Sequence, residues 1–259
     1  MEQMLQEEQE ELSRNRQVAV MIDLIKENMV DNKLRMQLNS TNARSLAKAM
    51  WANDTVTCLD LSSNDLSDHS GSYLARILQK NTTLKKMELD NNQLGPKSCI
   101  AFGESLLTNK SLIYLSIDSN PLCTNNDVTG IECLSNALKS NNTLTNLNLW
   151  RTGINAKGGE ILASAIEQNS SILCCDVSHN DINLSDVRRI VNQLDTNLTN
   201  YEAAERHGRE EQKEQDRVKL EKDKKEEVGV CFVGLFSSTP NHPIYFNHVC
   251  ILHILIRLV

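Results

Sequence analysis

The sequence predicts an α/β solenoid of stacked strand and helix units, and three observations predict it. An eleven-residue pattern with apolar residues at positions 1, 4, 6 and 11 recurs five times, with starts separated by 28, 28, 32 and 28 residues. Position 9 is asparagine in all copies but one. Between the copies runs a second apolar pattern with helical spacing. One strand, one turn and one helix therefore form each unit.

Each eleven-residue copy predicts a short strand followed by a turn. The five copies begin at Val56, Leu84, Leu112, Leu144 and Ile172. An asparagine suits a buried turn because its amide can both donate to and accept from backbone groups. Position 9 of the fourth copy is Thr152, which has only a hydroxyl, so we expect a locally altered turn there.

The blocks between the copies predict amphipathic helices. Their apolar columns lie four residues apart, and the first column is Leu46, Leu74, Phe102, Leu134, Leu162 and Ile190. Every block closes on an asparagine, and those from Asn53 to Asn169 begin Asn-x-Ser/Thr sequences. Because this triplet coincides with the repeat turn, we expect it to be structural rather than a glycosylation signal.

The two ends of the chain depart from the pattern. Val18, Met21, Ile22, Ile25 and Met29 form a helical stripe, so residues 1–37 are predicted to be a capping helix and a degenerate repeat before the repeat domain, 38–200. Residues 201–227 carry ten acids and eight Lys/Arg and predict a charged helical spacer that lacks sustained coiled-coil positions. Residues 228–259 form a hydrophobic tail that is a poor membrane span, and we expect it to be disordered or to derive from translated non-coding sequence.

The pattern LxxLxLxxNxL, alternating with full helices over residues 38–197, resembles the leucine-rich repeats of the ribonuclease-inhibitor-like subfamily. The resemblance implies a right-handed horseshoe arc with parallel strands on the concave side and helices on the convex side. Curvature follows because strands stack about 4.8 Å apart and helices about 8 to 10 Å apart. It does not fix activity, since the family includes an inhibitor, a GTPase activator, actin-capping proteins, immune sensors and ciliary proteins.

Composition and motifs point away from several classes of function. A net charge of -7 disfavours nucleic-acid binding. We find no nucleophile elbow, no HExxH motif and no phosphate-binding loop, and the cysteine spacings match no zinc site, so we expect no enzyme activity, catalytic residue, cofactor or metal. Eight cysteines in a chain that begins with acidic rather than basic and apolar residues indicate a reducing, cytoplasmic compartment.

The candidate site is the concave face, defined as positions 3, 5 and 7 of each copy with position 8 at its rim, because alternate strand residues point away from the core. Aromatic side chains there are typical of binding hot spots, and acids would steer a partner with a basic surface. The alternative is that the acids only keep the face soluble. The predicted partner-binding residues are Asp60, Lys86, Glu88, Asp90, Tyr114, Asp118, Trp150, Arg151, Asp176 and His179.

The sequence therefore predicts a monomeric, intracellular adaptor that binds a protein on its concave face, without nucleic acid or membrane. One alternative is a structural subunit of a cytoskeletal or ciliary assembly. Another is a GTPase-activating type of regulator, for which Arg151 is the only arginine identified on the concave face.

Overall fold

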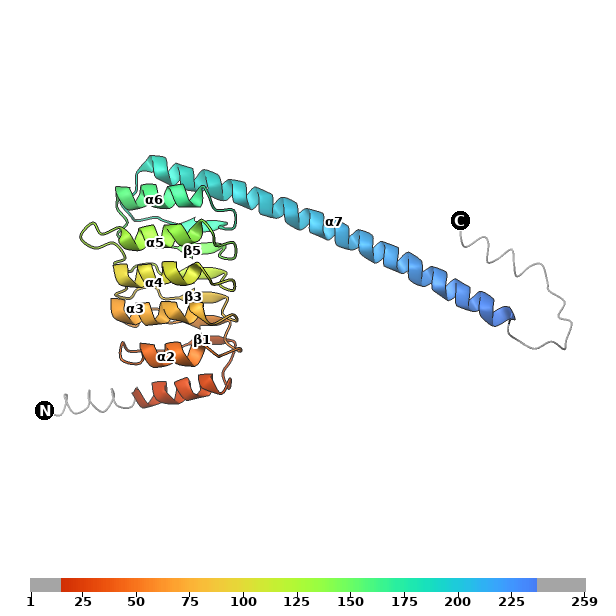
Figure 1. Ribbon diagram of the computed structural model, residues 1–259, viewed down its shortest axis with the longest axis horizontal. Coiled ribbons are helices and arrows are strands. Elements are labelled where there is room, and N and C mark those ends of the chain that lie inside the picture. The colour runs from red at the N-terminus through yellow and green to blue at the C-terminus, as the bar shows by residue number, and fades with distance from the viewer. Residues whose placement is uncertain (1–14, 237–259) are drawn as a thin grey trace. The chain divides into compact units, whose positions relative to one another are not determined.

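The computed structural model describes residues 15–236, and side chains for residues 15–222. Six parallel strands form one sheet in chain order, which confirms the predicted α/β leucine-rich-repeat solenoid (Figure 1). The strands are β1 (Lys33–Arg35), β2 (Cys58–Asp60), β3 (Lys86–Glu88), β4 (Tyr114–Ser116), β5 (Asn146–Asn148) and β6 (Cys174–Asp176).

Helices connect the strands and form the second layer. Figure 1 shows the helices from α2 to α6 stacked in one row beside the sheet. Their bounds are α2 (Ala43–Met50), α3 (Asp68–Ala75) with the 3₁₀ helix η1 (Arg76–Gln79), α4 (Pro96–Leu106), α5 (Thr129–Leu138), α6 (Ala156–Ile166) and α7 (Leu184–Phe236). The chain divides into two compact units, Met1–Glu202 and Ala203–Val259.

The core of the first unit lies between sheet and helices, and the repeat columns fill it. Parallel pairing sets Leu59 opposite Met87, and Leu115 opposite Leu147, so equivalent side chains stack from unit to unit. Positions 1, 4, 6 and 11 are buried throughout the first four copies. In the fifth copy Ile172 is buried, but Cys175, Val177 and Ile182 are only partly so.

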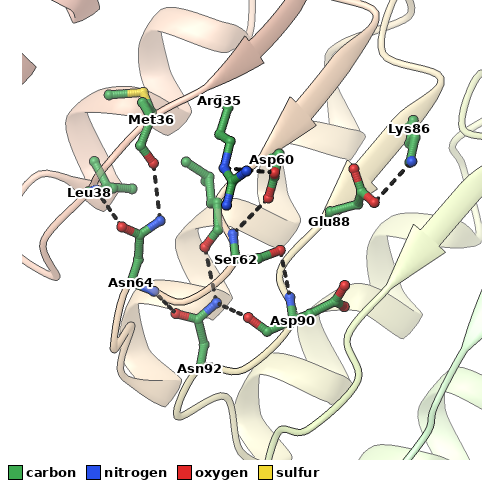
Figure 2. Close-up of polar contacts among 11 residues, drawn as sticks. Arg35, Met36, Leu38, Asp60, Ser62, Asn64, Lys86, Glu88, Asp90 and Asn92 are labelled. Carbon is green, nitrogen blue, oxygen red and sulfur yellow. Dashed lines mark hydrogen bonds and ion pairs between the residues drawn. The ribbon is translucent and has the colours of Figure 1, made fainter.

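The position 9 asparagines join neighbouring units, as their chemistry predicts. Asn92 Nδ2 donates to the carbonyls of Leu61 at 3.1 Å and Leu89 at 2.8 Å, while its Oδ1 accepts from the backbone N–H of Leu66 at 3.0 Å. Figure 2 shows its contacts with Asn64 and Asp90. Asn120 repeats the arrangement one unit on, donating to the Leu89 and Ile117 carbonyls. These hydrogen bonds satisfy backbone groups that have left the strand ladder.

The fourth copy keeps the backbone of the turn, so the altered turn expected at Thr152 is wrong in that respect. Arg151 before it has φ 50°, close to the left-handed values at position 8 of the other copies. The Thr152 hydroxyl donates to the Leu149 carbonyl at 2.8 Å, replacing the amide donor. The amide acceptor is missing, and the backbone N–H of Leu122 turns to the Asn120 carbonyl instead. The single hydroxyl hydrogen also leaves no counterpart of the bond that Asn120 donates to the Leu89 carbonyl of the preceding unit.

The asparagines that close the helical blocks are buried and are parts of the fold. Asn81 Nδ2 donates to the carbonyls of Met50 and Asn53 at 2.7 and 2.9 Å, and its Oδ1 accepts from the backbone N–H of Leu84. Equivalent bonds recur at the other closing positions, and none of these side chains is more than 4% exposed: Asn53, Asn81, Asn109, Asn141 and Asn169.

The N-terminal cap is shorter than its apolar stripe suggests. Residues 15–26 are helical and bury Val18, Ile22 and Ile25. Met29 was expected on the same stripe, but it is 69% exposed because the helix ends at residue 26 and Asn28 turns the chain with a φ of 55°.

The degenerate first repeat still supplies a strand in register, with Leu34 opposite Leu59. Its turn is abbreviated: one residue separates Met36 from Leu38, whereas four separate the equivalent Leu61 and Leu66.

Helix α7 shows no break at residue 200, where the last repeat helix was expected to end. It continues through the predicted charged helix, 201–227, and includes residues 228–236 of the predicted tail. Side chains from 203 to 222 are exposed, with local ion pairs such as Arg217 to Glu214 at 2.7 Å. No helix within residues 15–236 is long and apolar enough to cross a membrane. The rest of the tail, 237–259, lies outside the described residues.

Candidate functional site

The sheet brings the candidate residues onto one face, but in two kinds of position. Asp60, Lys86, Glu88, Tyr114 and Asp176 lie on strands, where register sets Asp60 beside Glu88 and Lys86 beside Tyr114. The other five lie in the turns that follow the strands. All ten are at least partly exposed, so each can contact a partner: Asp60, Lys86, Glu88, Asp90, Tyr114, Asp118, Trp150, Arg151, Asp176 and His179.

Three carboxylates of neighbouring units form an acidic cluster, Glu88, Asp90 and Asp118. Asp90 Oδ1 accepts hydrogen bonds from the Ser116 hydroxyl and from the backbone N–H of Asp118. Burial, followed by the charges of Asp118 and Glu88, raises the pKa of Asp90 to about 6, although the Ser116 hydrogen bond opposes the rise. The cluster therefore holds negative charge that is incompletely compensated within the chain.

Two basic side chains form ion pairs on this face, one with Glu88 of the acidic cluster and one with Asp60. Lys86 Nζ is 2.9 Å from Glu88 Oε1 (Figure 2), and this hydrogen bond raises the pKa of Lys86. Lys86 Nζ also lies 4.6 Å from the centre of the Tyr114 ring. Arg35 Nε lies 3.2 Å from Asp60 Oδ2. Arg35 was not among the predicted residues, so Arg151 is not the only arginine on this face. The sequence signal that could have identified Arg35 is the alignment of Leu34 with position 4 of the repeat, which puts Arg35 at position 5.

The aromatic residues do not form a single patch. We call Trp150, Arg151 and His179 the aromatic cluster: the Trp150 and His179 rings meet edge to face at 4.8 Å, and Arg151 Cζ lies 6.0 Å from the Trp150 ring. Tyr114 occupies position 3 and Trp150 position 7, a separation of about 13 Å along the strand direction. Tyr114 instead packs with Lys86, so the face offers two separate aromatic contacts.

Two of the cysteines are held in the thiol form by burial. Burial raises the pKa of Cys123 to about 11 and that of Cys175 to about 12, which keeps both thiols protonated near neutral pH. Among residues with described side chains, no group of three His, Cys, Asp or Glu is placed to hold a metal ion.

Comparison with known proteins places the chain in a class. A Leucine Rich repeat family model matches residues 52–75 and 80–103. Together with the sheet and the repeated turns, this match identifies the fold as a leucine-rich-repeat solenoid. It does not distinguish the ribonuclease-inhibitor-like subfamily. No curated protein shows significant sequence similarity to the chain.

Solved structures include similar folds. The tropomodulin C-terminal domain of Caenorhabditis elegans aligns with a TM-score of 0.50 and 17% identity, covering 73% of this chain and 97% of that one. Leiomodin-1 Actin-Binding Site 2 aligns with a TM-score of 0.47 and 19% identity, covering 73% and 94%. At this level of identity the first likeness establishes the fold alone.

Proposed function

We propose that the chain is a non-catalytic intracellular adaptor that binds a protein with a basic surface on its concave face. The leucine-rich-repeat fold indicates a protein-interaction module. One observation carries the choice of partner: the acidic cluster holds Asp90 partly buried between Asp118 and Glu88, with its pKa raised to about 6. A partner lysine or arginine placed there would favour the ionised carboxylate and gain binding energy from it.

The aromatic cluster supplies the second part of the proposed interface. The Trp150 ring is partly exposed and is held on one edge by His179, so little side-chain freedom remains to be lost on binding. Aromatic side chains in such positions are enriched in binding hot spots. The acidic cluster would attract the basic partner and the aromatic cluster would anchor it. Because the two clusters lie at separate places on the face, together they would fix the partner's orientation.

Affinity capture with the immobilised full chain tests the site. Proteins retained by the wild type should be lost from the double variant Trp150→Ala, Tyr114→Ala, because two anchors are worth more than about 2 kcal/mol, or roughly thirtyfold in affinity. The matched control is Trp51→Ala, since Trp51 is also exposed but follows helix α2, away from the sheet. Retention of every bound protein by the double variant would remove the concave face as the site.

Salt dependence tests the role of the acids once a partner is in hand. Asp90→Asn with Asp118→Asn should slow association and flatten its dependence on ionic strength, because both side chains keep their shape while losing charge. Asp54→Asn with Glu160→Gln, both exposed outside the concave face, is the matched control. Association rates unchanged by the first pair would contradict a basic partner at the acidic cluster.

The alternatives give different results with the same protein. A cytoskeletal subunit would co-sediment with actin filaments or microtubules, and the aromatic double variant would show whether the concave face is used. A GTPase-activating regulator would accelerate GTP hydrolysis by a small GTPase, and Arg151→Ala would abolish the effect if that arginine assists catalysis.

A further inference from the structure

We propose that a second copy of this chain binds the outward face of helix α7, so that two repeat domains join end to end around a twofold axis. The surface concerned is the terminal stripe, an apolar row at alternating spacings of three and four residues along the start of the helix. Its members are Leu184, Val187, Val191, Leu194, Leu198 and Tyr201. All belong to the first compact unit.

A neighbouring face of the same helix is already occupied. Asp186, Ile190 and Asn197 are buried against the repeat domain. Arg189 fixes this orientation, because its guanidinium bonds to Glu167 of the preceding unit at 2.7 Å and to Asp186 at 2.9 Å. The terminal stripe borders this buried face: Leu194 packs against the core and Val187 is half-buried, whereas the other four apolar side chains are exposed.

Exposure along the terminal stripe is large. Leu184, Val191, Leu198 and Tyr201 are 63%, 55%, 41% and 49% exposed. The same end of the domain leaves β6 paired on one side only, with β5, and leaves Val177 and Ile182 partly uncovered where every inner copy is closed. A contiguous apolar surface of this kind is typical of a protein interface.

The residue spacing of the terminal stripe and the charges beside it favour a second copy of this chain as its partner. A seam with a period of 3.5 residues fits another helix with the same seam. Antiparallel pairing around a twofold axis sets Leu184 against Tyr201, Val187 against Leu198, and Val191 against Leu194 of the second copy. The two residues of each pair lie at equal distances along the chain from the midpoint of the terminal stripe, so one twofold axis at that midpoint relates all three pairs.

The flanking charges agree with this register. Arg188 and Asp195 are exposed beside the terminal stripe. Antiparallel pairing in the stated register brings Arg188 of each copy next to Asp195 of the other, which gives two identical ion pairs. The twofold closes the contact, so assembly stops at the dimer. The proposed dimer differs from the monomer that the sequence predicts. The sequence alone does not show which face of α7 is buried, so it does not show that the terminal stripe is left uncovered.

Sedimentation velocity of the full chain between about 1 and 100 μM tests the dimer, since a contact of this size is expected to dissociate in the micromolar range. Wild type should shift from monomer to dimer with concentration, and Val191→Glu should remain monomeric. Asn192→Glu, at an exposed neighbouring position outside the terminal stripe, should dimerise like wild type. Circular dichroism confirms that each variant is folded.

Charge reversal tests the antiparallel register. Arg188→Glu and Asp195→Arg should each weaken self-association at least about tenfold, because each places like charges together in both ion pairs. An equimolar mixture of the two variants should recover dimerisation, since all facing charges are then opposite. A wild type that stays monomeric, a dimer that survives Val191→Glu, or a mixture that associates no better than its components would overturn the proposal.

Discussion

Replacing Asn92 by alanine should destabilise the repeat domain by an amount that can be worked out from its contacts. Asn92 donates to the carbonyls of Leu61, Leu89 and Asp90 and accepts from the backbone N–H groups of Asn64 and Leu66. Two of the three carbonyls keep another donor after the change, because Asn120 bonds to Leu89 and the Ser63 N–H bonds to Asp90.

Two buried backbone groups then remain without a partner, the Leu61 carbonyl and the Leu66 N–H. The Asn64 N–H is near the surface, where water can replace the lost acceptor. An unsatisfied buried group costs about 1 to 3 kcal/mol, so we expect a loss of about 3 kcal/mol. Asn92→Asp should cost at least as much at neutral pH, because a carboxylate would face carbonyl oxygens.

Urea unfolding followed by circular dichroism measures the change, provided that the slope of free energy against urea is the same for each variant. Asn142→Ala is the matched control, since Asn142 is exposed and makes none of these contacts, and it should change stability by less than about 0.5 kcal/mol. A loss below about 1 kcal/mol for Asn92→Ala would refute the role assigned to the position 9 amide.

Three further predictions concern other contacts. The pKa of Asp90 in the folded chain, about 6, exceeds its ordinary value of 3.8, so the ionised carboxylate destabilises the folded state as pH rises through 6. Asp90→Asn should therefore stabilise the domain at pH 7 by about 1 kcal/mol after solvent screening, and should leave its stability unchanged at pH 4. The Asp68 carboxylate accepts hydrogen bonds from the backbone N–H groups of Gly95 and Ser98 at the start of α4. Burial alone would raise the pKa of Asp68, but the hydrogen bonds to the carboxylate have the larger combined effect and lower it. Asp68→Ala should therefore cost about 1 to 2 kcal/mol at neutral pH, and the difference should shrink on acidification below the ordinary pKa. Thr152→Asn should restore the missing acceptor for the preceding turn and add about 0.5 to 1 kcal/mol in the same urea assay.

The core could be predicted from the sequence because burial in this fold repeats with the chain. Leu59, Met87, Leu115 and Leu147 occupy one column of the pattern and lie opposite one another in the sheet. Strand alternation also predicted that the ten candidate residues are turned away from the core, and all ten are at least partly exposed, although Ser116 at position 5 of the third copy is buried.

The other features of the site could not be predicted, because they depend on geometry that the alignment of the repeats does not contain. Arg35 was missed because a shortened turn after β1 hides its place in the repeat. The contact of Asp68 with the next unit was missed because both partners lie where the chain leaves the periodic pattern. The separation of Tyr114 from Trp150 needed the length of the strand as well as its order.

The closing asparagines have a consequence for where the chain can fold. Asn53, Asn81, Asn109, Asn141 and Asn169 each begin an Asn-x-Ser/Thr triplet, and each amide nitrogen lies inside the stack and donates to at least one backbone carbonyl of the preceding unit. A sugar joined to such a nitrogen during synthesis would replace one of those hydrogens and need space that the neighbouring unit fills. The stack can close only on a chain whose asparagines have escaped that modification.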